Sequence, residues 1–151
     1  MQKQQGFSLI ELLVVLGIIG ALTAIAIPQY QKYQDKAKVT AAIATLTNMR
    51  SVVEAYVMEE GEFPATAKDK DEGKNPLGIP DEVELASTGK VAGTMTIGVE
   101  GLPGDDEQTV VLTRAESGGW TCTQPLEDKV SNCDSDGNGN GNGNGNGNGN
   151  G

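Results

Sequence analysis

The chain has 151 residues, the length of about one domain, and its 11 basic against 21 acidic side chains give a formal charge of -10. Nucleic-acid backbones are bound by clustered lysines and arginines, so direct binding of nucleic acid along this surface is not expected. The chain has no histidine and two cysteines, which excludes a zinc site of the Cys/His type and removes the commonest general base. No nucleophile–base constellation is visible, so we do not expect an enzyme or a bound cofactor.

Composition divides the chain into three regions. Residues 7–27 are nearly all apolar, residues 28–136 are mixed and acidic, and residues 137–151 contain only glycine and asparagine. The last region has no apolar side chain to bury against the entropy of ordering, so we expect it to be disordered.

The apolar run of residues 7–27 predicts a membrane-spanning helix. Its 21 residues contain one charge, Glu11, and at ~1.5 Å per residue they extend roughly 31 Å, the thickness of a bilayer core. No cleavage site of the secretory type follows the run, and Lys3 before it favours a cytoplasmic N-terminus.

Glu11 lies four residues inside this predicted span. A carboxylate in hydrocarbon costs on the order of 2.5–3.5 kcal/mol on insertion scales. Two interpretations stay open: the side chain lies near the interface and is partly solvated, or it pairs with a positive group supplied by another subunit.

The segment Gly6-Phe7-Ser8-Leu9-Ile10-Glu11 resembles the prepilin peptidase signature of type IV pilins, and the similarity continues into Pro28-Gln29-Tyr30. The resemblance implies that prepilin peptidase removes residues 1–6 by cleavage between Gly6 and Phe7, and that the new Phe7 amine is N-methylated. It also implies that Glu11 pairs with the terminal amine of a neighbouring copy. The precursor would then lie in the inner membrane, and the pilus assembly machinery would polymerise it into an extracellular homopolymer.

The helix is expected to continue to about residue 60. Pro28 lacks a backbone donor and should kink or locally unwind it. Beyond Pro28, apolar side chains recur at helical spacing and define an amphipathic half over residues 28–60. Gly61 and Pro64 end the pattern. The stripe consists of Val39, Ile43, Leu46, Met49, Val53 and Tyr56.

Residues 61–136 predict a small β-rich head. Residues 61–82 are a loop rich in glycine and proline, and three or four short strands follow, over 91–99, 109–114 and 120–123. Strands that follow one long helix predict an α+β fold with an antiparallel sheet laid on the helix. This architecture, with a C-terminal cysteine pair, also matches type IV pilins.

Cys122 and Cys133 predict one structural disulfide, because an exported domain with two cysteines most simply joins them. A weaker pattern follows them. Asp134, Asp136 and Asn138 match the first half of a calcium loop, but its twelfth position is Gly145 instead of an acid.

The other acidic clusters, at residues 69–72, 81–84 and 105–107, are expected to be solvated faces, although such runs can bind a cation.

The sequence therefore predicts the structural subunit of a type IV pilus, a fibre used in adhesion, twitching motility or DNA uptake. One alternative is a pseudopilin of a type II secretion system, which has the same anchor in a different machine. The second is a monomeric membrane-anchored module that binds a ligand outside the cytoplasm. That module would need neither cleavage at Gly6 nor a partner for Glu11.

Overall fold

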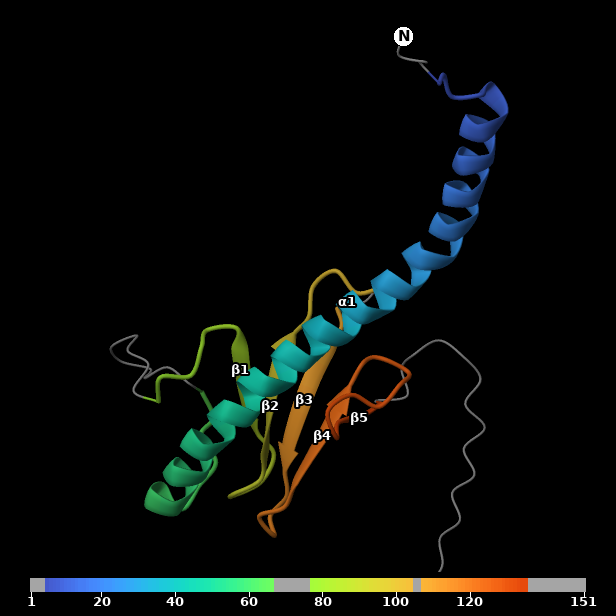
Figure 1. Cartoon of the computed structure of the whole chain (residues 1–151). Coiled ribbons are helices and arrows are strands. Elements are labelled where there is room, and N and C mark those ends of the chain that lie inside the picture. Colours follow the sequence, from blue (N-terminus) through green and yellow to red (C-terminus); the bar gives the residue numbers. More distant parts are fainter. Residues whose placement is uncertain (1–4, 67–76, 105–106, 136–151) are drawn as a thin grey trace, which may run out of the picture. The chain divides into compact units, whose positions relative to one another are not determined.

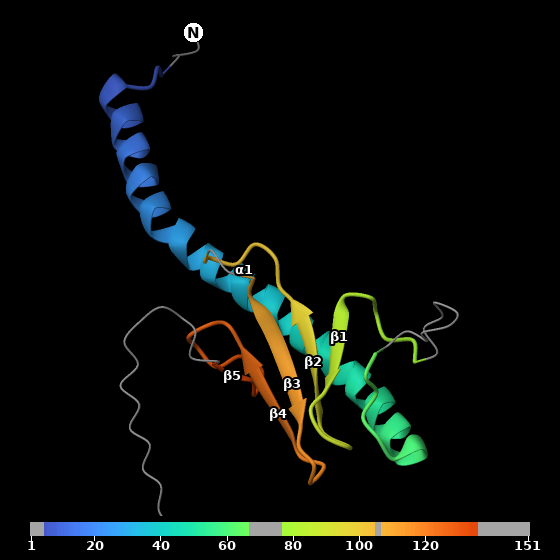
Figure 2. The ribbon, with the colours of Figure 1, turned by 180° about the vertical axis from the view of Figure 1, so that it is seen from behind.

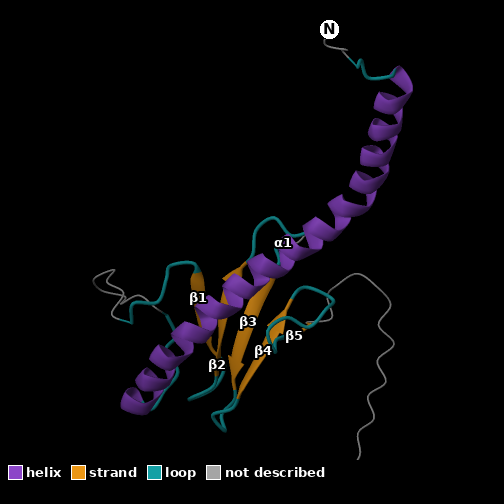
Figure 3. Cartoon of the chain, in the orientation of Figure 1, coloured by secondary structure: helices purple, strands orange, loops and turns teal. Residues whose placement is uncertain are grey.

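The computed structural model describes residues 5–66, 77–104 and 107–135. Within these residues one helix precedes five strands, which confirms the α+β class (Figures 1 and 3). The elements are α1 (Leu9–Glu60), β1 (Val83–Ser87), β2 (Gly93–Gly98), β3 (Thr109–Arg114), β4 (Trp120–Gln124) and β5 (Asp134–Ser135).

The chain divides into two units, residues 1–35 and residues 36–151, with the boundary inside α1. The described part of the first unit is mainly helix. Helix α1 begins at Leu9, two residues later than the expected residue 7. The helix continues through Pro28, so the prediction of local unwinding there is wrong. Proline removes a single hydrogen bond, and the bonds of the flanking turns keep the backbone helical. The predicted kink at Pro28 stays a prediction.

The second unit holds the sheet, whose strands lie in the order β1-β2-β3-β4-β5 (Figure 2). The first four strands are antiparallel neighbours, and Met95 of β2 stands between Leu85 of β1 and Leu112 of β3. The short strand β5 pairs with β4 in parallel. The predicted antiparallel sheet is confirmed in β1 to β4. The sequence did not indicate the short parallel edge, which forms where the chain returns beside β4 after the disulfide loop.

The core of the second unit lies between residues 36–60 of α1 and one face of the sheet (Figure 1). Four members of the predicted stripe are buried, while Met49 and Tyr56 are half-buried. Ala42 and Val57 complete the buried face because they lie one residue beside the stripe. The buried helix residues are Val39, Ala42, Ile43, Leu46, Val53 and Val57.

The strand predictions differ from the structure at their edges. The segments 109–114 and 120–123 are confirmed, whereas 91–99 shortens to Gly93–Gly98. Strand β1 was not placed by the sequence, because Val-Glu-Leu-Ala-Ser carries few β-branched and no aromatic side chains. The edge of β2 supplies its pairing partner instead, over the full length of five residues.

Gly93 lets the segment after α1 close over the sheet. The ring of Phe63 is buried against this glycine, and the Phe63 N–H donates to the Lys90 carbonyl over 2.8 Å. A methyl group on Gly93 would overlap the Phe63 ring.

We expect Gly93→Ala to lower the free energy of unfolding by about 2 kcal/mol, because overpacking forces side chains and backbone to shift. Gly119→Ala is the matched control, since an added methyl there meets no atom within 4 Å. Chemical denaturation of the detergent-solubilised full chain measures both. Equal stability of the two variants would contradict the packing argument.

Candidate assembly site

The helix begins with the glutamate half of a capping box, in which Glu11 bonds back to Ser8. The Ser8 N–H donates to Glu11 Oε2 over 2.9 Å, and the Leu12 N–H donates to the Ser8 carbonyl over 3.3 Å. The bond pairs the backbone donor of Ser8 itself, as a glutamate three residues after an N-cap serine commonly does. The sequence pattern Ser-x-x-Glu indicates this bond, a role for Glu11 beside the two interpretations of its charge given above.

Gly6 and Phe7 lie outside the helix, immediately before this cap. The Phe7 side chain is 83% exposed, and an added methyl group on Gly6 would meet no atom within 4 Å. Exposed backbone outside a helix is accessible to a peptidase, whereas the helix beyond Ser8 is not. The structure therefore places the predicted scissile bond beside the first residue that can cap the helix.

The apolar run presents its side chains outward on every side of the helix. This segment is long and apolar enough to cross a membrane, and none of its most apolar stretch is buried. Such surface is stable in lipid or against other apolar helices, but not in water. The side chains that are more than half exposed are Leu9, Ile10, Leu12, Leu13, Val14, Val15, Leu16, Ile18, Ile19, Leu22, Ile25 and Ile27.

The disulfide joins Cys122 of β4 to Cys133, as the sequence predicted, with the two Cα atoms 4.7 Å apart. Val130 and Cys133 exchange backbone hydrogen bonds across a tight turn. Ser131 and Asn132 hold positive φ angles of 48° and 63° in that turn, a conformation that asparagine tolerates better than most residues.

Gln124 organises the same loop from inside, a role that the sequence did not indicate. Its buried amide Nε2 donates to the carbonyls of Leu126 and Asp128, and its Oε1 accepts the Leu126 N–H. Asp128 in turn pairs with Lys36 of α1 over 3.1 Å. Alternation of the strand predicts an inward side chain at this position, but no local pattern identifies the loop carbonyls that it bonds.

A second polar cluster joins α1 to the sheet. Arg114 of β3 forms a two-pronged pair with Glu54, through Nε at 2.9 Å and Nη2 at 3.2 Å, and also donates to the Val91 carbonyl. Trp120 Nε1 donates to the same Glu54 carboxylate. The Arg114 side chain is only 9% exposed and that of Glu54 26%. Glu54 lies outside the predicted apolar stripe of α1, and no local pattern in the sequence indicates its partners.

Comparison with known proteins assigns this architecture. Residues 1–27 match the model of the prokaryotic N-terminal methylation motif, and residues 36–134 match the model of the pilin of bacterial filaments. The chain belongs to the pilin family. The first match spans the cap and the apolar run, and the second spans the head and its disulfide.

Several relatives of this pilin are named as fimbrial proteins, type IV pilins or prepilin peptidase-dependent proteins. A fimbrial protein of Pseudomonas aeruginosa is 32% identical over 142 residues, covering 81% of this chain and 86% of the relative. The prepilin peptidase-dependent protein D of Escherichia coli K12 is 37% identical over 135 residues, covering 88% and 85%. The type IV major pilin protein PilE1 of Neisseria gonorrhoeae is 31% identical over 139 residues, covering 88% and 77%.

The methylation motif and the exposed apolar helix together give the location of the pilin. The precursor is anchored in the membrane by this helix, and the mature chain belongs to the extracellular pilus fibre.

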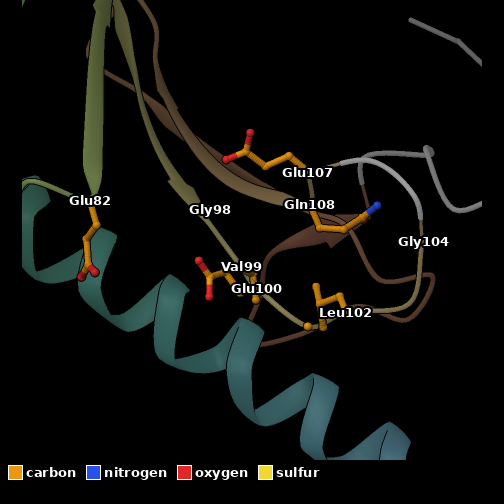
Figure 4. A pocket seen from close by; sticks show the side chains of 9 residues that line it. Glu82, Gly98, Val99, Glu100, Leu102, Gly104, Glu107 and Gln108 are labelled. Atoms are coloured by element: carbon orange, nitrogen blue, oxygen red, sulfur yellow. The ribbon is translucent and has the colours of Figure 1, made fainter.

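The described head of the pilin also carries an acidic hollow of about 660 Å³ (Figure 4). Glu82, Glu100 and Glu107 line it, from the segments before β1, after β2 and before β3. The fold thus brings together members of two acidic clusters that are distant in sequence. No group of three potential metal ligands occurs within residues 5–66, 77–104 and 107–135.

The weak calcium-loop pattern at residues 134–138 lies only partly within the described chain of the pilin. Asp134 is exposed, and its carboxylate pairs with Lys129 over 2.8 Å. Asp136, Asn138 and the rest of the glycine–asparagine tail lie outside the described residues.

Removing the disulfide of the pilin should lower the free energy of unfolding by about 3 kcal/mol, because the reduced chain regains the entropy of a loop near this length. The variant that removes it carries both Cys122→Ser and Cys133→Ser. Chemical denaturation compares this double variant with the oxidised wild-type chain. The wild-type chain under reducing conditions is the control and should match the double variant. An unchanged midpoint would contradict the argument.

Proposed function

We propose that this pilin is the repeating subunit of a type IV pilus and polymerises through its N-terminal helix. The observation that carries the proposal is the apolar helix whose side chains are exposed all round, behind a cap that holds one carboxylate. A lipid anchor needs the apolar surface, but it does not need an acid at residue 11. In a helical bundle of identical subunits, the apolar surface packs against neighbouring helices and the carboxylate pairs with the terminal amine of another copy.

Assembly follows from the chemistry of the two ends of this segment. After cleavage, Phe7 carries a positive amine, and Glu11 of a neighbouring copy offers a carboxylate that the Ser8 N–H holds at the first helical turn. Opposite charges attract more strongly in the low-dielectric core of a bundle than in water. Gly17 and Gly20 have no side chain and no neighbour at their Cβ positions, so another helix can approach closely there.

The heads would then cover the outside of the fibre and present the disulfide loop. Such a fibre serves adhesion, twitching motility or DNA uptake. Direct DNA contact along the shaft is unfavourable, because the formal charge of -10 repels the phosphate backbone. Prepilin peptidase and the pilus assembly machinery are the partners that this route requires.

Mass spectrometry of sheared surface fibres tests the proposal. The expected chain begins at Phe7, carries one added methyl group and has lost two hydrogens at the cysteines. A processed chain confined to the inner membrane would favour the secretion pseudopilin. An unprocessed chain in a host with active prepilin peptidase would contradict both and leave the monomeric anchor.

A further inference from the structure

Two tyrosines follow directly after the apolar run. Tyr30 and Tyr33 are 65% and 72% exposed, and the exposed Lys32 lies between them. Residues three apart on a helix are neighbours on its surface, so the two rings share one face. These side chains belong to the same unit as the membrane-spanning segment, and they continue its exposed surface beyond its C-terminal end.

The chemistry of this group fits the boundary between hydrocarbon and headgroups. A tyrosine ring is apolar along its body and polar at its hydroxyl, and such rings gather where a membrane helix leaves the hydrocarbon. Lysine extends its charge toward phosphate groups from the same depth. The preceding residues up to Ile27 are apolar, whereas the exposed Gln29 and Gln31 are polar. The change from lipid to headgroup chemistry therefore falls within this turn.

We propose that Tyr30, Lys32 and Tyr33 form an interfacial anchor that binds the phospholipid headgroup layer outside the cytoplasm and sets the depth of the precursor in the bilayer. The inference deepens the proposed function and rests on it in one respect, namely that the chain passes through a membrane-anchored state before assembly. Continuity with the membrane-spanning surface identifies the occupant as lipid.

The anchor has a consequence at the other end of the helix. Glu11 lies 19 positions before Tyr30 in an unbroken helix, which is roughly 29 Å at ~1.5 Å per residue. The hydrocarbon is about 30 Å thick. With Tyr30 at one boundary, the Glu11 carboxylate lies within a turn of the opposite one, next to headgroup water. The Gly6–Phe7 bond lies beyond that boundary, on the cytoplasmic side.

Depth-dependent fluorescence quenching tests the location of the anchor. The full chain with Tyr30→Trp is placed in vesicles of phosphatidylethanolamine and phosphatidylglycerol whose acyl chains carry bromine at a shallow or a deep carbon. The signal of Trp120 is subtracted with the unsubstituted chain. We expect the added tryptophan to be quenched more by shallow than by deep bromine. Stronger quenching by deep bromine, or none, would overturn the proposal.

A reporter in the span tests whether the tyrosines set its depth. Leu16→Trp lies off the midplane, so the direction of a shift can be read. Adding Tyr30→Ala with Tyr33→Ala should move the reporter by up to about 5 Å, one helical turn. The matched control adds Gln29→Ala with Gln31→Ala in the same turn and should leave it unmoved. An equal depth in both backgrounds would overturn the inference.

The vesicles contain no assembly machinery, so this result is independent of whether the chain forms fibres. If the tyrosine variants keep their depth but reduce the yield of sheared fibres, the two rings contact a second copy of the chain instead of lipid. That outcome rejects the anchor and leaves the proposed pilus subunit intact. If depth shifts as expected while no fibre forms from the wild-type chain, the anchor stands and the proposed function fails.

Discussion

Replacing Glu11 with alanine is expected to abolish pilus fibres while leaving the removal of residues 1–6 intact. A pair of unit charges about 4 Å apart is worth roughly 4 kcal/mol at an effective dielectric constant of 20. Loss of that energy at each added subunit lowers the association constant by about a thousandfold. The measurement is the yield of sheared fibres together with the N-terminal mass of the membrane-bound chain.

Two further substitutions separate the charge of Glu11 from its capping role. Glu11→Gln keeps an oxygen that can accept the Ser8 N–H but removes the charge, so it should fail to assemble. Glu11→Asp keeps the charge on a shorter side chain and should retain part of the fibre yield. Normal fibres from Glu11→Gln would contradict the pairing with a neighbouring amine and would assign the residue to the helix cap.

The substitution Glu54→Leu is expected to lower the free energy of unfolding by about 3–5 kcal/mol. It leaves the guanidinium of Arg114, 9% exposed, without its carboxylate partner, and an unpaired buried charge is costly. Trp120 Nε1 loses its acceptor in the same step. Chemical denaturation of the full chain in detergent measures the effect.

A double substitution shows whether the cost comes from the unpaired charge. Removing both partners with Glu54→Leu and Arg114→Met should be less destabilising than Glu54→Leu alone, because no buried charge then remains. Glu59→Leu replaces an exposed glutamate five residues further along α1 and serves as the control, which should change stability little. If the double variant lost as much free energy of unfolding as Glu54→Leu and Arg114→Met lose in total when made singly, the two residues would not be coupled.

The same cluster predicts how stability depends on pH. The Arg114 guanidinium, followed by the Trp120 donor, holds the pKa of Glu54 below its usual value against an opposing effect of burial. A lowered pKa in the folded state means that Glu54 contributes its full stability above the unfolded-state pKa of about 4.3. That contribution is lost as the pH falls through the lower folded-state value. Denaturation from pH 6 to pH 3 should therefore show a steeper loss for the wild type than for Glu54→Gln.

The local chemistry of the sequence was sufficient for several features. A run of apolar residues with one acid needs no tertiary contact to predict a membrane helix, and the stripe of Val39, Ile43, Leu46 and Val53 follows from the period of the helix alone. The disulfide was also predictable, because the chain offers only Cys122 and Cys133. Each of these inferences depends on residue type and spacing along one element.

Features that depend on a distant partner were decided only in the folded chain. Strand β1 has weak propensity and forms because β2 offers it an edge. Glu54 and Arg114 are 60 residues apart in sequence and form a pair because α1 crosses the sheet at that point. The Gln124 amide is buried because its loop closes around it. Periodicity shows which face of an element is buried, whereas the partner on the other side depends on how the elements pack.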